Sequence, residues 1–391
     1  MIFVKQNERI LISCMIIGIV KILSFFIKLR NLVHFMNERT WLEVFNRLYL
    51  TKDLSLNDAI KPIYVGYKII ERCNQRCVHC WAGKNDGVVP SLNDVISGLD
   101  KLKQLQPLHL TITGGEPLMH EDWFSIVQYA KNNFPIVELF TNAVLFTEES
   151  VKRLSKIFDE NDYVQVSLDG LEKSYMKQRG VDDFKHVVAN IQLLVTYGIN
   201  VRVNMTITHL NVNDMLGVYE LLRDIGIASF SISPVYPLRR GKNLIPLVDY
   251  DEYLVNSEKI KKLYSKTKET MHLEIIYPIE IQSREARKLE NSKDISRFNL
   301  DLLHWTIDAK GDIFHFMDHF PIKELKIGNI YSNTTDELLS KDYKIQTSIM
   351  YHSSVGTKCS QCTLNDYCTG FGYLNSYPEI ASDFRRCSFE I

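Results

Sequence analysis

From residue 61 onward, short apolar segments alternate with longer segments in which apolar residues recur at helical spacing. The short segments are rich in Val, Ile and aromatic residues and end in turn-forming residues, which is typical of buried strands. This alternation predicts six strands with helices between them. The predicted strands are Ile63–Ile70, Leu108–Thr113, Ile136–Phe140, Tyr163–Leu168, Val201–Thr208 and Ser229–Ser233.

The longer segments predict helices over residues 91–105, 121–133, 148–158, 183–197 and 211–225. Ser91, Asp182 and Asn211 precede three of them as expected N-terminal caps. Strand–helix repeats of about thirty residues indicate right-handed βαβ units and a parallel sheet. Six such units fit an open doubly wound sheet or a barrel, and periodicity alone does not decide between these two α/β folds.

The remaining segments divide the chain into four predicted regions. Residues 1–60 form an N-terminal extension, 61–250 carry the repeat, 251–300 are a charged bridging segment, and 301–391 form a C-terminal domain. The bridge contains a strand-like piece at Leu273–Tyr277. The last region opens with a predicted hairpin. Its strands are Trp305–Asp308 and Ile313–Phe316, joined at Lys310-Gly311-Asp312.

The N-terminal extension contains a strongly apolar run, Ile10–Ile27, which Lys21 interrupts. The run is just long enough to cross a bilayer, but a lysine near its middle is costly there. No small-residue cleavage site follows, which disfavours a secretory signal. The other two readings are a helix that packs on the protein or a partner and one that contacts a membrane surface. We therefore expect a cytoplasmic protein, with membrane association through residues 10–27 as the open alternative.

Composition is ordinary for a soluble globular protein: 45% of the 391 residues are hydrophobic and 24% are charged. The net charge of −1 gives no argument for nucleic-acid binding. The eight cysteines are at positions 14, 73, 77, 80, 359, 362, 368 and 387. Two groups of cysteines near opposite ends of a long chain are not the pattern of a disulfide scaffold. They indicate two metal sites in a reducing compartment.

Cys73, Cys77 and Cys80 form a C-x3-C-x2-C pattern directly after the first predicted strand. A loop with this spacing can turn three thiolates toward one point, and thiolates are the usual ligands of iron–sulfur clusters. Because a cubane cluster has four irons, three cysteines leave one iron open, which is typical of a catalytic metal site. The alternative is a structural zinc site, which would need a fourth ligand, and His79 lies between two of the cysteines.

The pattern resembles the motif of the radical S-adenosylmethionine (SAM) enzymes, C-x3-C-x-φ-C, with His79 in the φ position. This resemblance implies that the amino and carboxylate groups of SAM bind the open iron of a [4Fe–4S] cluster. It also implies a partial (β/α)6 barrel of the TIM type, with the site at the C-terminal ends of the strands. A flavodoxin- or ferredoxin-type partner would supply the electron.

The second predicted strand ends in Gly114-Gly115-Glu116, where two glycines let the backbone approach a ligand closely. The stretch lacks the G-x-G-x-x-G spacing of a nicotinamide site. It resembles the GGE motif of the same family, which implies that Glu116 accepts from the amino group of SAM. Polar residues at or near later strand ends are further SAM-binding candidates. They are Asn142, Ser167, Arg179 and Asn204.

Four further cysteines lie in the tail: Cys359, Cys362, Cys368 and Cys387. They suffice to ligate one cubane cluster or one zinc ion. Their layout resembles the SPASM extension of radical SAM maturases, which usually carries seven cysteines and two auxiliary clusters. Phe316 and Gly372 stand where two of those cysteines are expected. The resemblance therefore implies an α+β iron–sulfur domain with one auxiliary [4Fe–4S] cluster, while His304, His315 and His319 are less typical substitute ligands.

Together these features predict a radical SAM enzyme with a SPASM-like domain. The family resemblance implies reductive cleavage of SAM to a 5′-deoxyadenosyl radical and hydrogen abstraction from a substrate. A ribosomally made peptide or protein is the leading substrate class, modified by crosslinking, epimerisation or oxidation. Side-chain modification of a tetrapyrrole, as in haem d1-type maturases, is the enzymatic alternative. A non-catalytic iron–sulfur electron carrier or zinc-binding adaptor is the alternative of another class, and the complete set of Cys73, Cys77, Cys80 and Glu116 argues against it.

Overall fold

The computed structural model describes residues 61–80, 86–235, 239–244, 248–267, 270–276, 304–315 and 326–352. The apolar run at residues 10–27 and the four tail cysteines lie outside these stretches, so the expectations for them stay predictions. Within the stretches, no helix combines the length and the apolar character needed to cross a membrane.

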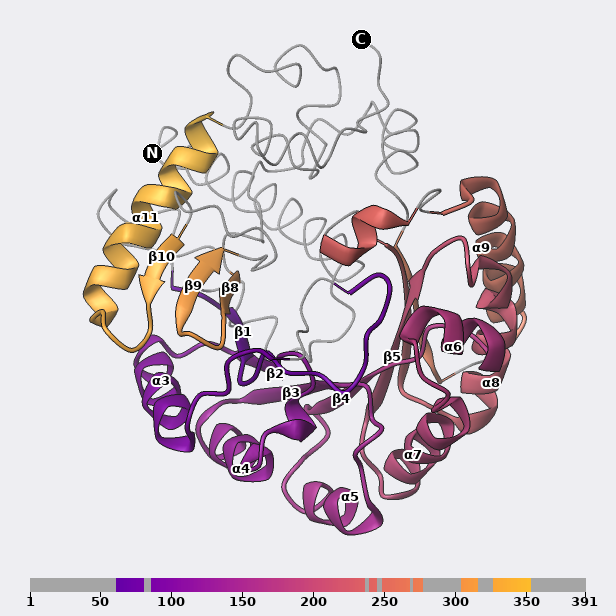
Figure 1. Ribbon diagram of the computed structural model, residues 1–391, viewed down its shortest axis with the longest axis horizontal. Coiled ribbons are helices and arrows are strands. Elements are labelled where there is room, and N and C mark those ends of the chain that lie inside the picture. Colours follow the sequence, from indigo (N-terminus) through magenta and orange to yellow (C-terminus); the bar gives the residue numbers. More distant parts are fainter. Residues whose placement is uncertain are drawn as a thin grey trace, which may run out of the picture. The chain divides into compact units, whose positions relative to one another are not determined.

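One sheet organises this part of the chain (Figure 1). Its strands follow one another in the order β10-β9-β8-β1-β2-β3-β4-β5-β6-β7. All neighbours from β8 to β7 pair in parallel, whereas β9 and β10 add antiparallel at one edge. The strands are β1 (Tyr64–Lys68), β2 (His109–Thr113), β3 (Ile136–Thr141), β4 (Tyr163–Ser167), β5 (Val201–Ile207), β6 (Ser229–Pro234), β7 (His272–Ile275), β8 (His304–Ile307), β9 (Asp312–His315) and β10 (Lys326–Asn329).

The central strands have one apolar face and one polar face, because successive side chains of a strand point to opposite sides. Strand β5 shows this most clearly. Its apolar residues at positions 201, 203, 205 and 207 are fully buried. Between them, Arg202, Asn204 and Thr206 are polar and half-buried. The sheet therefore presents a polar face on which side chains near the strand ends can meet a ligand.

The helices pack on the apolar face (Figure 1). In α3, Val95, Leu99 and Leu102 recur at helical spacing and are fully buried in the same core as the strands. The helices and short 3-10 turns (η) are α3 (Leu92–Leu105), η1 (Pro117–Met119), α4 (Trp123–Asn133), α5 (Glu148–Leu154), α6 (Glu172–Arg179), α7 (Phe184–Thr196), η2 (Val212–Asp214), α8 (Met215–Ile225), η3 (Arg239–Asn243), α9 (Tyr250–Tyr264) and α11 (Thr335–His352).

The six predicted strands and the five predicted helices are all present, with shifted ends. Ser91 caps α3 through reciprocal hydrogen bonds with Asp94, as predicted. The other two expected caps differ. Helix α7 follows Asp183 rather than Asp182, and Asn211 makes no side-chain capping bond.

The sheet is wider than six repeats imply. Strand β7, within the predicted bridge, pairs in parallel with β6. The predicted hairpin is confirmed as β8 and β9, but β8 also pairs in parallel with β1, so the hairpin extends the main sheet. Periodicity could not show this, because which strands pair depends on contacts distant in sequence. The division of the chain at residues 250 and 300 stays a prediction.

Candidate active site

The loop that carries the first three cysteines follows β1 and docks on the loop that follows β2. The Gly115 N–H donates to the Ile70 carbonyl at 2.7 Å, and the Glu116 N–H donates to the Arg72 carbonyl at 2.8 Å. A Cβ on Gly115 would lie 2.1 Å from the Arg72 oxygen, and one on Gly114 only 2.2 Å from the Ile70 oxygen. Each position thus requires glycine. The predicted glycines let two strand-end loops approach each other at the edge where parallel strands end.

None of the three cysteines of this loop forms a disulfide: Cys77 is buried, and Cys73 and Cys80 are half-buried. Two of the sulfurs have N–H donors. The Gln75 N–H lies 3.4 Å from Cys73 Sγ, and Arg179 Nη1 lies 3.6 Å from Cys77 Sγ. Burial raises the pKa of Cys73 to about 12. Burial also raises the pKa of Cys77, and Arg179 opposes that rise.

This donor set fits a cubane cluster better than a single ion. Nowhere in the described stretches are three or more His, Cys, Asp or Glu side chains arranged to hold one metal ion. A cubane separates its thiolate ligands more widely than one ion does, and ligation removes the thiol proton. Three cysteines with N–H donors aimed at two of their sulfurs match such a cluster, with one iron left open.

Helix α6 also holds the cysteine loop. The Val78 N–H donates to the Gln178 carbonyl at 2.9 Å. The side chain of Gln75 bridges two residues of the helix: its Nε2 donates to the Tyr175 hydroxyl at 3.2 Å, and its Oε1 accepts from Arg179 at 3.3 Å. The loop is therefore fixed both by backbone and by buried side chains.

The buried carboxylate of Asp169, just after β4, joins the loop to this helix. Its Oδ2 lies 2.5 Å from Arg179 Nη2 and 3.3 Å from His79 Nε2, and its Oδ1 accepts from the Thr206 N–H at 2.7 Å. Burial lowers the pKa of His79 to about 4. Asp169 opposes that shift, whereas the guanidinium groups of Arg179 and Arg240 add to it. The His79 imidazole is therefore neutral near pH 7, with its Nε2 facing the carboxylate of Asp169.

Glu116 is a buried carboxylate, only 1% exposed, whose position is fixed by three donors. Its Oε1 accepts from the Leu118 N–H at 3.0 Å and from the Thr141 hydroxyl at 2.6 Å. Its Oε2 accepts from the Asn142 N–H at 2.7 Å. Burial raises the pKa of Glu116, and these hydrogen bonds oppose the rise. None of the ion pairs in the described part of the chain includes Glu116, and the charge of Arg179 also opposes the rise of its pKa.

The remaining predicted residues fall into two groups. Asn142 supports the cysteine loop: its Nδ2 donates to Asn74 Oδ1 at 2.7 Å, and its Oδ1 accepts from the Val144 N–H at 3.1 Å. Ser167 and Asn204 are register partners on β4 and β5 and are half-buried on the polar face. These two side chains remain accessible to a ligand.

Two residues of this network were not predicted from the sequence, Asp169 and Gln75. Asp169 lies two residues after Ser167, at the same strand end. Its position at a strand end is the signal that could have identified it as a site residue. Gln75 lies inside the cysteine pattern, and nothing in the spacing marks it. His79 Nδ1 and Arg179 Nε are among the buried atoms that have no hydrogen-bond partner in the described chain. They are the groups that a ligand at this site would satisfy.

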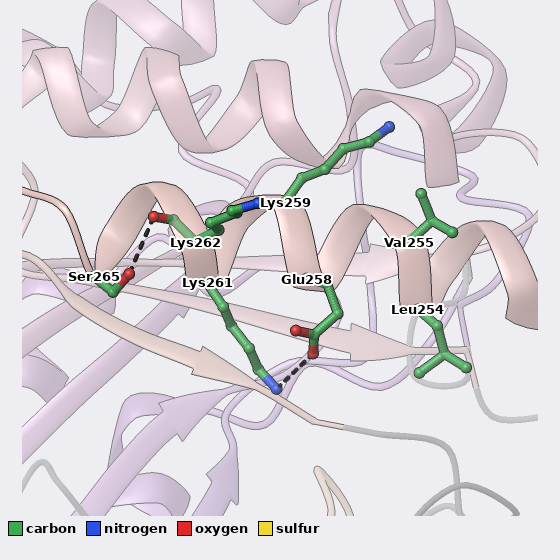
Figure 2. Close-up of a pocket in the computed structure, with 7 residues that line it drawn as sticks. All are labelled: Leu254, Val255, Glu258, Lys259, Lys261, Lys262 and Ser265. Atoms are coloured by element: carbon green, nitrogen blue, oxygen red, sulfur yellow. Dashed lines mark hydrogen bonds and ion pairs between the residues drawn. The ribbon is translucent and has the colours of Figure 1, made fainter.

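A surface hollow along α9 shares no residue with this site (Figure 2). Its polar side chains in part satisfy one another: Lys261 Nζ lies 3.2 Å from Glu258 Oε1, and the Ser265 hydroxyl donates to the Lys262 carbonyl at 3.1 Å. All of its lining residues belong to α9 or directly follow it. The hollow brings together no set of residues suited to cluster or SAM chemistry.

Comparison with known proteins identifies a domain within the chain. The pattern of the Radical SAM superfamily matches residues 67–222. The chain is 25% identical over 324 residues to the antilisterial bacteriocin subtilosin biosynthesis protein AlbA of Bacillus subtilis, covering 80% of this chain and 68% of that protein. It is 24% identical over 341 residues to the Fe-coproporphyrin III synthase of Methanosarcina barkeri, covering 79% of this chain and 82% of that protein.

A solved structure is similar over most of the chain. Streptococcus suis SuiB bound to precursor peptide SuiA superposes with a TM-score of 0.68 at 18% identity, covering 85% of this chain and 76% of that chain. At this identity the likeness shows the fold alone, and it confirms the predicted partial barrel of the TIM type. The matched residues 67–222 include the three-cysteine loop, Gly114–Glu116 and the ends of β3, β4 and β5. The chain therefore contains a radical SAM domain, for which a [4Fe–4S] cluster and SAM are the implied cofactors.

Proposed function

We propose that this enzyme is a maturase that modifies a ribosomally synthesised peptide or protein. The observation that carries the proposal is the similarity to the subtilosin biosynthesis protein over 80% of this chain, which joins an intact three-cysteine loop to peptide biosynthesis. A structure of the same fold holds a precursor peptide, which supports the same substrate class. The reaction would be a crosslink, an epimerisation or an oxidation, and thus of the oxidoreductase or maturase type.

The residues that would hold SAM lie around the cysteine loop. Cys73, Cys77 and Cys80 would hold the cluster, and the fixed carboxylate of Glu116 would accept from the ammonium group of SAM. Its backbone neighbours Gly114 and Gly115 keep the two loops in register for that contact. The carboxylate and ribose of SAM are bound by the accessible side chains Ser167 and Asn204, by Arg179 Nε and by His79, with Asn142 supporting the loop from β3.

When bound, the cluster supplies one electron for the reductive cleavage of SAM to methionine and a 5′-deoxyadenosyl radical, which abstracts a hydrogen atom from the substrate. The chain contributes position and charge. Glu116 offers a negative group to the ammonium of SAM at a site that hydrogen bonds have already ordered. The neutral His79 adds no positive charge that would compete with that group.

A second candidate function is modification of tetrapyrrole side chains. It is favoured by the similarity to the Fe-coproporphyrin III synthase. The aligned region covers 82% of that protein, compared with 68% of the subtilosin biosynthesis protein. An iron tetrapyrrole with carboxylate side chains would occupy the same polar face of the sheet.

One experiment separates these functions. The reconstituted full-length enzyme, with SAM and a flavodoxin-type reductant, is incubated with a short peptide encoded beside its gene or with an iron tetrapyrrole bearing propionate groups. We expect 5′-deoxyadenosine to rise with the peptide, together with a mass change in the peptide. A response to the tetrapyrrole alone would transfer the assignment to the second function. No 5′-deoxyadenosine from either substrate, or without one, would favour the non-catalytic electron carrier or zinc-binding adaptor.

We also propose that the tail belongs to a SPASM-like domain with one auxiliary [4Fe–4S] cluster. Its ligands would be Cys359, Cys362, Cys368 and Cys387. Two clusters give about eight irons per chain. Cys362→Ala should remove about four of them while SAM still binds at the first cluster. Iron near four together with one zinc would show that the tail is a structural zinc site instead.

A further inference from the structure

Arg179 reaches a cysteine sulfur from outside the cysteine loop. It is the last residue of α6, and it is buried. Its Nη1 donates to Cys77 Sγ at 3.6 Å and to Gln75 Oε1 at 3.3 Å. Its Nη2 lies 2.5 Å from Asp169 Oδ2. Two of the three guanidinium nitrogens are therefore committed to the loop and to the residue that anchors it.

Asp169 gives this arrangement a fixed direction. The carboxylate is fully buried, and its Oδ1 is held by the Thr206 N–H at 2.7 Å, on the neighbouring strand β5. A planar guanidinium that meets a fixed carboxylate has little freedom to turn. The contact between Arg179 and the sulfur is thus set by the sheet and does not depend on a flexible side chain.

The charge of Arg179 is maintained next to the sulfur. Burial by itself would lower the pKa of Arg179, but Asp169 and Cys77 outweigh burial and raise that pKa above its ordinary value. Hydrogen bonds to the ligand sulfurs, net charge and burial set the reduction potential of an iron–sulfur cluster. A cation beside a ligand sulfur favours the reduced cluster, because that form carries one more negative charge.

We propose that Arg179 is a positioning residue that holds the cysteine loop and raises the reduction potential of its cluster through the hydrogen bond to Cys77. The inference rests on the proposed function in that the loop must hold a [4Fe–4S] cluster. It is separate from any contact with SAM, because that contact would use Nε, which is buried without a partner in the described chain.

The test is a redox titration of the reconstituted full-length protein in the absence of SAM, followed by electron paramagnetic resonance. Omitting SAM removes any effect of Arg179 on SAM binding. A parallel sample with SAM identifies the signal of the first cluster as the one that SAM changes. The variants are Arg179→Gln and the matched control Arg202→Gln. Arg202 is half-buried on the sheet, and like Arg179 it pairs with a buried carboxylate: its Nη1 lies 3.1 Å from Glu138 Oε1. Unlike Arg179, it lies near the N-terminal end of β5.

At the potential that reduces half of the wild-type cluster, we expect the ratio of reduced to oxidised cluster in Arg179→Gln to fall about tenfold. For a one-electron couple this is a midpoint about 59 mV lower. Arg202→Gln should keep the wild-type midpoint. An unchanged midpoint in Arg179→Gln, or equal shifts in both variants, would overturn the proposal. Absence of any cluster from the wild type would instead refute the proposed function.

A milder variant keeps the test decisive if Arg179→Gln takes up no iron. Tyr175→Phe removes only the hydroxyl that accepts from Gln75 Nε2 at 3.2 Å and keeps the buried ring. Gln75 then holds Arg179 less firmly, so the midpoint should move in the same direction by a smaller amount. Thermal unfolding of each apoprotein checks that the fold is intact. If Arg179→Gln takes up no iron, a Tyr175→Phe variant that binds its cluster and keeps the wild-type midpoint would overturn the proposal.

Discussion

The sheet has a buried glutamate toward each end of its strands, and the two have opposite surroundings. Glu138, near the start of β3, is fully buried among basic side chains and hydroxyls: Arg202 Nη1 is 3.1 Å from its Oε1, and His109 Nε2 is 3.2 Å from its Oε2. The hydroxyls of Tyr64 and Thr111 also donate to its Oε2, at 3.1 and 3.2 Å. We refer to these five residues as the Glu138 network.

Glu116, at the opposite end, accepts only from neutral groups. Two of its three donors are backbone N–H groups, and the third is the hydroxyl of Thr141. The pKa values follow this difference. Burial raises the pKa of Glu116, and its hydrogen bonds only oppose the rise. Burial would likewise raise the pKa of Glu138, but Arg202 and His109 hold it at about 2.

The comparison separates stability from function in residues of the same type. In the Glu138 network, the carboxylate of Glu138 is paired with Arg202. This pairing stabilises the N-terminal end of the sheet and leaves no negative charge there for a cationic ligand. Glu116 is held by neutral donors and is in no ion pair of the described chain, an arrangement that suits a cationic ligand. In a barrel of this type the site lies at the C-terminal ends of the strands, which is where Glu116 and the cysteine loop are.

The largest effect should come from removing the cluster ligands. In the triple variant with Cys73, Cys77 and Cys80 changed to Ala, we expect the loss of about four irons per chain and of all 5′-deoxyadenosine formation. The Glu138 network is at the other end of the sheet, so a Glu138→Gln control should keep its iron. Iron and 5′-deoxyadenosine are measured on the same preparations. Full iron content in the triple variant would contradict the cluster assignment.

The next largest effect should be on folding, and only at the N-terminal end. Glu138→Ala leaves Arg202 buried without its partner, so the free energy of unfolding should fall by about 3–5 kcal/mol. Glu149→Ala, which removes an exposed carboxylate, should change it by less than about 0.5 kcal/mol. Denaturant unfolding measures both. SAM affinity of the folded Glu138→Ala protein should be that of the wild type, and a selective loss of affinity would break the comparison.

Acid should expose the same difference. The pKa of Glu138 is about 2 in the folded protein, below the ordinary value of about 4.3 that applies when it is unfolded. Its contribution to stability is therefore complete above about pH 4.3 and is lost as the pH falls toward 2. Glu138→Gln should flatten the curve of unfolding free energy against pH in that window. A curve parallel to the wild type would mean that the Glu138 network does not lower this pKa.

Most of the fold could be read from the sequence because its signals are local. The strands are apolar and β-branched, and helices such as α3 carry apolar residues at regular spacing. Helix α6 escaped because it is short and polar, and its buried Tyr175 and Arg179 lie on it without an apolar stripe. The pairing of β8 with β1 escaped because residues far apart in the chain determine it.

The candidate site was predictable in its ligands and not in its supports. Spacing marks Cys73, Cys77 and Cys80, and two glycines before Glu116 mark the loop beside them. No spacing marks Asp169, because its role depends on meeting Arg179 and His79 in space. The same limit applies to Glu138, which reads in the sequence as a lone charge inside an apolar strand.

A smaller, more specific effect is expected from Glu116→Gln. The change keeps the shape and removes the charge that would meet the ammonium group of SAM. We expect SAM binding to weaken by about 1–3 kcal/mol, the scale of a hydrogen bond to a charged group. Calorimetric titration with SAM measures this, and Glu138→Gln serves as the matched control with no change in affinity. Equal SAM affinity in Glu116→Gln and wild type would remove Glu116 from the binding site.

The smallest effects should come from the two threonines that hold these glutamates. The Thr141 hydroxyl donates to Glu116 at 2.6 Å and also accepts from the Ala143 N–H at 2.9 Å, whereas the Thr111 hydroxyl donates to Glu138 at 3.2 Å. Valine keeps the shape of threonine without the hydroxyl. Thr111→Val should lower the free energy of unfolding by about 0.5–1.5 kcal/mol and leave SAM affinity unchanged, because the other members of the network still hold the carboxylate.

Thr141→Val should cost more in stability, since it leaves a buried N–H without an acceptor, and should weaken SAM binding about fivefold by loosening Glu116. Unfolding and calorimetry on both variants give the four values. If the two variants reduced SAM affinity equally, the two ends of the sheet would not be independent, and the division between a closed network and a site prepared for a cation would be wrong.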